Sequence, residues 1–212
     1  MASNPGTATP VGSGYPVSLR VIDEREMNRL WGIPVVGMAV RGFLAIPHAV
    51  VLMILGIGIN VWTFLGWIPI LLNGRVPAVA VKLLTEYIHR YTRIAAYVAC
   101  LMPGAYPPLE PGAPGPVDLH MSLDSLEINR WWGIPLFGLL VRILVVLPQI
   151  IVLSLAWTAV ALTWLVLWIP ILASGRYPGW AVSFYGFALL YTARVGAYVM
   201  FLPVPYPPIW LD

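Results

Sequence analysis

Charged residues are what this sequence has least of. Only 10% of its 212 residues are charged, whereas 59% are hydrophobic and the mean hydropathy is +0.82. A typical soluble domain is about 25% charged. Because so few charges cannot cover a folded chain with polar surface, the composition excludes an ordinary cytosolic enzyme and a disordered tail. It indicates an integral membrane protein.

Cysteine and clustered positive charge are also scarce. Cys100 is the only cysteine, which excludes a small secreted module held together by disulfides. The 12 basic residues exceed the nine acidic ones, but the arginines are spread singly among apolar runs. A phosphate backbone is bound by basic residues gathered on one face, so we expect no nucleic-acid partner. Residues 1–15 have neither a basic end nor an apolar stretch, so no cleavable signal is predicted.

The residue patterns of common active sites are missing as well. The sequence has no Gly-x-Ser-x-Gly, no His-Glu-x-x-His and no phosphate-binding Gly-rich loop, and Glu86 is the only acidic residue between Glu26 and Glu110. We therefore predict no enzyme, no metal site and no cofactor. His48 and His89 are weak candidates for a cofactor ligand. Their depths in the predicted helices differ by roughly 20 Å, so both cannot hold one cofactor.

An internal repeat organises the chain. A shift of 101 positions places residues 31–34 (Trp-Gly-Ile-Pro) on 132–135, and residues 67–71 (Trp-Ile-Pro-Ile-Leu) on 168–172. Shared apolar composition cannot keep Arg, Pro, Gly and Trp in register over such a length, so we interpret the match as a duplication. The predicted organisation is a flexible tail over residues 1–16, a membrane repeat over 17–109, a Pro/Gly-rich linker over 110–116 and a second membrane repeat over 117–212.

Each repeat is predicted to open with a short strand and an amphipathic helix. Residues 17–21 and 117–121 alternate apolar and polar side chains, which favours strands. Asp23 with Glu26, and Asp124 with Glu127, then have the spacing of a helix N-cap and its partner three residues later. The apolar stripe of the following helix suits the membrane interface. Packing on its own domain is an equally good explanation of that stripe.

A two-helix membrane hairpin is predicted to follow in each repeat. Residues 42–72 and 143–173 contain no ionisable side chain except His48, which favours one long tilted helix per repeat. We expect these helices to begin at Pro47 and Pro148 and to end near residue 72 or 172. A break at residues 56–60 would instead give a re-entrant hairpin, but the second copy has no turn residue there. A shallow hairpin is the alternative.

Turns and second helices complete the hairpins. Gly74 and Gly175 are expected to leave the first helix in the left-handed conformation, and second helices are predicted over residues 78–102 and 179–202. The predicted fold class is therefore an all-α membrane protein with about four membrane helices. If both turns lie on one side, the other side holds more arginines, which predicts a multi-pass protein of the cell membrane with cytoplasmic termini.

Three sets of side chains are candidates for contacts. The charges that could meet lipid headgroups or a partner are Arg29, Arg41, Arg75, Arg93, Arg130, Arg142, Arg176 and Arg194. The aromatic residues expected at the membrane interface are Trp31, Trp67, Tyr106, Trp132, Trp168 and Tyr206. The polar face of the helix over residues 78–102 consists of Lys82, Glu86, His89 and Arg93. Because Glu86 can pair with Lys82 or Arg90 at a spacing of four, we favour a structural role for this face over a polar pathway.

Several repeated motifs resemble those of a known family. In the first copy these are Arg41, residues 46–48 (Ile-Pro-His), 74–77 (Gly-Arg-Val-Pro), 93–97 (Arg-Ile-Ala-Ala-Tyr) and 106–108 (Tyr-Pro-Pro). The pattern resembles the bacterial integral-membrane family catalogued as domain of unknown function four-three-eight-nine. It covers about residues 23–109 and again 124–209, although Gln149 stands where the first copy has His48. The resemblance implies a multi-helix membrane protein and no particular activity.

The leading functional hypothesis is a non-catalytic membrane scaffold, either an accessory subunit of a membrane complex or a homo-oligomer. It rests on ten tryptophans, ten tyrosines and the absence of catalytic groups. A small transporter or channel that uses the polar face of residues 78–102 is the first alternative. A lipid-binding or membrane-shaping hairpin protein is the second. The expected partners are the lipid bilayer and either a membrane protein or a second copy of this chain.

Overall fold

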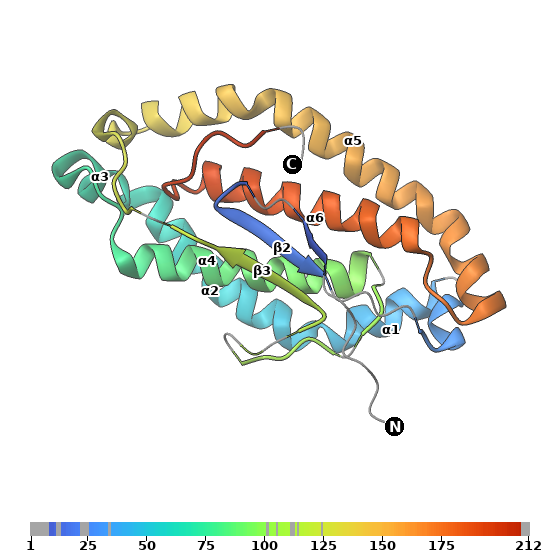
Figure 1. Cartoon of the computed structure of the whole chain (residues 1–212). Helices are drawn as coiled ribbons and strands as arrows, with labels where there is room; N and C mark the ends of the chain where they lie inside the picture. The colour runs from blue at the N-terminus through green and yellow to red at the C-terminus, as the bar shows by residue number, and fades with distance from the viewer. Residues whose placement is uncertain are drawn as a thin grey trace.

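The computed structural model describes residues 9–11, 14–21, 26–33, 35–100, 102–104, 106–110, 113, 115–123 and 125–208. Most of this part of the chain is helical (Figure 1). The first copy contributes the helices α1 (Val36–Leu44), α2 (Ile46–Leu65), α3 (Trp67–Asn73) and α4 (Ala78–Ile94), the last followed by one π-helical stretch, η2 (Ala95–Ala99). The second copy contributes α5 (Phe137–Ser174) and α6 (Gly179–Val199).

A small antiparallel sheet contains strands from both copies. Its order is β1 (Thr9–Val11), β2 (Val17–Val21) and β3 (Val117–Met121), so both predicted strands are confirmed. Strand β1, which lies within the tail predicted over residues 1–16, pairs antiparallel with β2. In the β2–β3 ladder Leu19 lies opposite Leu119. That pair marks the centre of an approximate two-fold arrangement of the two copies.

The hairpin turns have the predicted conformation. Gly74 and Gly175 have φ angles of 64° and 67°, and their N–H groups bond to the carbonyls of Ile70 and Ile171, four residues earlier. Glycine adopts this left-handed region without the steric penalty of a Cβ atom. The next helices start at Ala78 and Gly179, as predicted.

The first helix of each hairpin begins earlier than predicted. In the first copy α1 starts at Val36, and Pro47 lies near the start of α2 after a break at Ala45. In the second copy Pro148 lies inside α5, so it is not the first helical residue. A proline removes one N–H and usually kinks or breaks a helix, but here the residues on both sides stay helical. α2 also passes through residues 56–60 without the re-entrant break.

The predicted amphipathic α-helix between strand and hairpin is wrong in the described residues. Only a single turn of 3-10 helix forms in each copy, η1 (Arg29–Gly32) and η3 (Arg130–Gly133). Their N-caps are the side chains of Asn28 and Asn129. Asp23 and Asp124, the predicted caps, lie outside the described residues. A proline follows each turn closely and disfavours helical conformation in the residue before it, which keeps the turn short.

The two copies run in opposite directions and exchange their opening segments. The turn of the first copy pairs with the start of the second, since the Ile128 N–H bonds to the Gly74 carbonyl at 2.9 Å. The converse bond runs from Met27 to Gly175, also at 2.9 Å. The two turns therefore lie at opposite ends of the molecule (Figure 1). The arginine count that predicted cytoplasmic termini assumed two parallel hairpins with both turns at one end of the molecule, and the antiparallel arrangement removes that assumption.

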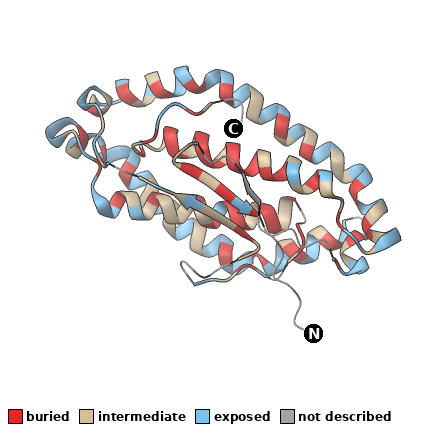
Figure 2. Cartoon of the chain, viewed as in Figure 1, coloured by how far each residue is buried: buried red, intermediate tan, exposed pale blue. Residues whose placement is uncertain are grey.

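The core lies where α4 and α6 meet the sheet. Helix pairs α2 and α4, α4 and α6, and α5 and α6 are in contact, while β2 lies on α6 and β3 on α4. Figure 2 shows α6 largely buried, whereas α2 and α5 expose much of their surface. Within the described residues these two helices alone are long and apolar enough to cross a membrane, by length and composition. Four membrane helices are therefore not established.

Candidate functional site

Two equivalent junctions between the copies combine charged and apolar side chains. In the first, η3 packs on α3 beside the turn over residues 74–77; in the second, η1 packs on the end of α5 beside the turn over residues 175–178. We call them the first and second seam. A Cβ atom added at Gly133 would lie 2.4 Å from the Leu71 backbone nitrogen, so the first seam requires glycine. Gly32 has the same place in the second seam.

The polar half of the first seam has two arginines and one glutamate. The Arg75 guanidinium donates to the Glu127 carboxylate at 2.7 Å, and both side chains are about two-thirds exposed, 66% and 65%. The Arg130 side chain crosses the turn, because a Cβ atom on Gly74 would lie 3.1 Å from its Cγ atom. These residues line an open depression of about 1120 Å³ together with Pro69 and Leu72.

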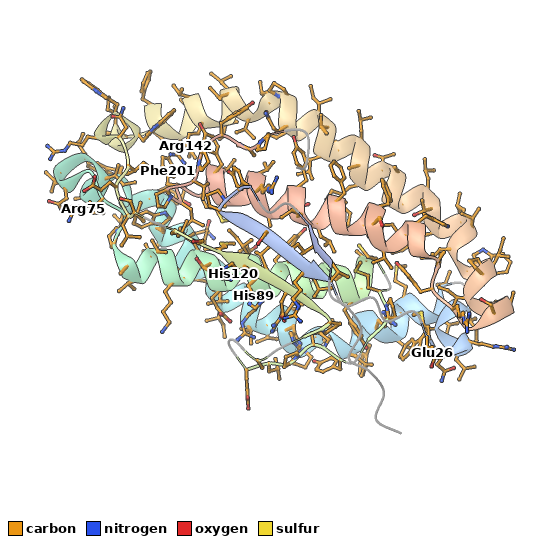
Figure 3. All side chains as sticks on the ribbon, viewed as in Figure 1. Glu26, Arg75, His89, His120, Arg142 and Phe201 are labelled. Carbon is orange, nitrogen blue, oxygen red and sulfur yellow. The ribbon has the colours of Figure 1, made fainter. Side chains whose placement is uncertain are left out.

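The second seam repeats this arrangement. Glu26 and Arg176 form a backbone bridge, as Arg75 and Glu127 do, and the Arg29 side chain lies against Gly175. The depression here measures about 500 Å³. Arg29, Arg75, Arg130 and Arg176 are all exposed. Figure 3 places Arg75 and Glu26 at opposite ends of the molecule, so the two seams are far apart.

An apolar groove lies beside each polar depression. At the first seam Trp62, Trp67, Trp132, Leu136 and Phe201 line about 180 Å³. At the second seam the corresponding groove measures about 240 Å³ and is lined by Trp31, Met38, Trp164, Trp168 and Ile171 among others. Trp67 and Trp168, predicted interface residues, are thus brought to the seams. Their side chains are partly exposed, by 36% and 38%.

Arg41 and Arg142 are buried behind the seams and cannot reach headgroups. Arg41 donates to the Tyr97 and Met102 carbonyls at 2.9 and 2.8 Å, and its guanidinium lies over the Trp31 ring. Burial lowers the pKa of Arg41, while Tyr97 opposes the shift.

Arg142 occupies the equivalent place in the second copy. It donates to the Tyr198 carbonyl, and its guanidinium lies over the rings of Trp132 and Phe201. Figure 3 shows Arg142 beside Phe201. Carbonyls at a helix C-terminus have no partner within the helix, and a cation satisfies them. The headgroup role predicted for Arg41 and Arg142 is therefore wrong, and each instead fixes the end of a hairpin.

Arg93 and Arg194 are buried where the helices meet the strands, so their predicted headgroup role is also wrong. Arg93 bonds to the Val117 carbonyl and pairs with Asp118 on β3, and Arg194 bonds to the Val17 carbonyl on β2. Each arginine thus ties a helix of one copy to the strand of the other.

The polar face of α4 is divided between ion pairs and solvent. Glu86 pairs with Arg90, as its spacing predicted, and Lys82 is exposed. His89 lies 3.8 Å from Asp118. Burial, followed by the Arg93 charge, lowers the pKa of His89. Figure 3 shows His89 and His120 close to β3. The residues of this face therefore bond mainly to other residues of α4 and to β3 of the second copy.

The tyrosines that close each copy bond to the first helix of the same copy. The Tyr106 hydroxyl lies 3.0 Å from the Leu44 carbonyl oxygen and 2.8 Å from His48 Nδ1, and Tyr206 donates to the Val145 carbonyl at 3.0 Å. His48 is therefore buried in a local contact. Within the described residues no three His, Cys, Asp or Glu side chains gather in a way that could hold a metal ion.

Sequence reasoning did not find the seams. The spacing of Glu26 and Glu127 predicts only helix-capping partners, yet each residue pairs with the turn of the other copy. The duplication of both Glu26 and Arg75 one copy later was the signal available. It did not say that the partners come from different copies.

Comparison with known proteins identifies the duplicated unit. The family model described as domain of unknown function (DUF4389) matches residues 36–108 and 138–210. Each match starts within one residue of the start of α1 or α5, and both leave out β2, β3, η1 and η3. Neither the curated proteins nor the solved structures gave a match. The chain belongs to the DUF4389 family and contains two tandem copies of its domain.

Proposed function

We propose that this chain is a non-catalytic membrane protein whose helices lie parallel to the bilayer plane, with α2 and α5 in one leaflet and the sheet facing water. Its role is to bind lipid and shape the membrane surface. The exposed apolar surface of α2 and α5 is the observation that supports this proposal best. The bilayer is then its principal partner, and a protein partner or a second copy remains a prediction.

The exposed surface of these helices is unlike that of a soluble protein. Only 6% of the most apolar stretch of α2 and 22% of that of α5 are buried. On α2, Met53, Ile57 and Phe64 are 63%, 61% and 74% exposed, and on α5 Leu155 and Leu165 are 66% and 70% exposed. Soluble monomers rarely expose large contiguous apolar patches, and lipid contact removes this surface from water.

The two-fold arrangement favours helices in the membrane plane over helices that cross it. The Leu19–Leu119 centre lies midway between the two turns, and around it the exposed Arg20 and His120 project from the sheet. If the helices stood upright, this polar face would lie at the middle of the bilayer. A charged side chain there costs about 2.5–3.5 kcal/mol or more. In the plane, the same face meets water.

Helix length favours the same placement. The 38 residues of α5 extend about 57 Å at 1.5 Å per residue, while a hydrocarbon core is about 30 Å thick. An upright α5 would leave apolar side chains such as Leu140 and Ile169 at its ends in water. A helix in the plane has no such length limit.

Cysteine accessibility tests this placement. In a Cys100→Ser background, single cysteines replace Asn73 and Ser174, the last helical residue before each turn, and His120 on the sheet; all three positions are exposed. Intact cells and inverted membrane vesicles are labelled with a membrane-impermeant maleimide. We expect all three cysteines to react from the same side of the membrane.

Other placements give different results. Upright helices in this fold put Asn73→Cys and Ser174→Cys on opposite sides and hide His120→Cys from both. A parallel arrangement of two hairpins puts both turns on the side away from His120→Cys. Either result would overturn the proposal. Failure of the chain to co-sediment with vesicles would overturn membrane binding itself.

A further inference from the structure

The geometry points to a phospholipid site at each seam, with the phosphate bound by Arg130 or Arg29 and the headgroup amine by Glu127 or Glu26. Phosphoethanolamine has both groups and, unlike phosphoserine, no further carboxylate to meet Glu127 or Glu26. The inference rests on the proposed membrane function and names the lipid chemistry that the seams recognise.

The charges of the first seam match a zwitterion. Arg130 is exposed and has no ion-pair partner among the residues that the structure describes, whereas Arg75 is paired with Glu127. A guanidinium presents a planar fork of N–H donors that fits phosphate oxygens. A primary ammonium presents three N–H donors, and the exposed Glu127 carboxylate can accept them. Phosphate and amine therefore have separate partners within one depression.

The second seam supplies the same set from the opposite copies. Arg29 lies across the Gly175 turn as Arg130 lies across Gly74, and Glu26 bridges to Arg176 as Glu127 bridges to Arg75. Both sets follow from the tandem duplication and its two-fold arrangement, so a lipid bound at one seam has an equivalent site at the other. The first-seam depression, about 1120 Å³, is open and has room for a lipid headgroup.

The apolar groove provides a place for an acyl chain. Helices α3 and η3 line both the polar depression, through Pro69 and Arg130, and the groove, through Trp67 and Trp132. The groove volumes of about 180 and 240 Å³ suit part of a chain rather than a whole lipid. A headgroup in the depression would thus leave one acyl chain beside tryptophan rings and the rest in the leaflet.

The two-fold arrangement places both sites in one leaflet. When the helices lie in the membrane plane, the axis through Leu19 and Leu119 runs along the membrane normal, and the two seams have the same depth. Each chain would then bind two lipids of the same type, one at each end of the molecule.

The test measures lipid selectivity in the full-length chain. Detergent-solubilised protein is mixed with equal amounts of phosphatidylethanolamine, phosphatidylcholine and phosphatidylglycerol of identical acyl chains, and bound lipids are counted by native mass spectrometry. We expect up to two phosphatidylethanolamines per chain and weaker retention of the other two lipids. Soluble phosphoethanolamine is added in a second arm and should compete poorly, because it has no acyl chain.

Matched variants separate phosphate binding by the arginines from amine binding by the glutamates. Arg130→Gln should lower phosphatidylethanolamine affinity at one site by about tenfold, the effect of losing a charge-assisted hydrogen bond, and adding Arg29→Gln should do so at both. Glu127→Gln with Glu26→Gln should keep phosphate binding and remove the preference for ethanolamine over choline. Lys82→Gln removes an exposed positive charge outside the seams and should change nothing.

Several results would overturn the inference. These are equal retention of all three lipids, a preference for phosphatidylglycerol, an equal effect of Lys82→Gln, or competition by soluble phosphoethanolamine as strong as that of the lipid. Unfolding midpoints of all variants are measured, so that loss of folding is not taken for loss of binding. Co-sedimentation with pure phosphatidylcholine vesicles distinguishes the two proposals, because the membrane function predicts binding there even when the lipid selectivity is absent.

Discussion

Replacing Gly133 by alanine should separate the two copies at the first seam. The added Cβ atom would lie 2.4 Å from the Leu71 nitrogen, 2.8 Å from its Cα atom and 2.9 Å from the Trp67 carbonyl oxygen. All three are backbone atoms of α3, so the clash cannot be relieved by a change of rotamer. Overpacking of this kind costs about 1–3 kcal/mol, and we expect the upper end. A loss of about 3 kcal/mol lowers the unfolding midpoint by about 6–12 °C in a chain of this size.

Two other glycines provide the comparison. An alanine at Gly32 would meet the Ile171 side chain at 2.8 Å and the Leu172 backbone nitrogen at 3.0 Å, so its backbone clash is milder than the 2.4 Å contact at Gly133 and the loss should be smaller. An alanine at Gly42 in α1 would have no heavy atom within 4 Å. Helix interiors favour alanine over glycine by about 0.5–1 kcal/mol, so Gly42→Ala should raise the midpoint slightly.

Thermal unfolding in detergent, followed by tryptophan fluorescence, measures the series. From the highest unfolding midpoint to the lowest, the expected order is Gly42→Ala, Gly32→Ala and Gly133→Ala. If Gly133→Ala were as stable as Gly42→Ala, the close packing of η3 on α3 would be refuted, and with it the exchange of opening segments between the copies.

Two further predictions concern the same junctions. Arg41→Lys keeps the charge, but lysine has no planar group that can hold both the Tyr97 and Met102 carbonyls. The unfolding midpoint should therefore fall by the equivalent of about 1–3 kcal/mol. The control, Arg20→Lys on the exposed face of the sheet, should leave the midpoint unchanged. Arg75→Cys with Glu127→Cys, in a Cys100→Ser background, should form a disulfide on mild oxidation, since bridged residues of antiparallel strands lie about 4.5–5.5 Å apart between Cα atoms. After proteolysis in the linker, non-reducing electrophoresis should show the two copies still joined; separation would contradict the pairing.

The features that the sequence predicted well depend on a few neighbouring residues. Gly74 and Gly175 end their helices in the left-handed conformation because glycine has no Cβ atom, and the alternating residues 17–21 and 117–121 form strands. The pairing of Glu86 with Arg90 follows from a spacing of four on one helix. None of these requires knowledge of a distant partner.

The candidate site could not be predicted in this way. Eight arginines were expected at headgroups, but Arg41, Arg93, Arg142 and Arg194 are buried on backbone carbonyls or strand carboxylates, while Arg29, Arg75, Arg130 and Arg176 stay exposed at the seams. Sequence spacing treats all eight alike. Their separation depends on which helix ends are covered by the opening segment of the other copy.

Composition, duplication and turn chemistry were thus determined by the sequence alone, because each is a property of the residues themselves or of their near neighbours. The direction of one copy relative to the other was decided only by the tertiary structure. A tandem repeat has the same sequence whether its copies lie parallel or antiparallel, and here the pairing of Leu19 with Leu119 and of each opening segment with the opposite turn selects the antiparallel arrangement. That choice moves the turns to opposite ends and places the polar sheet at the centre of the molecule.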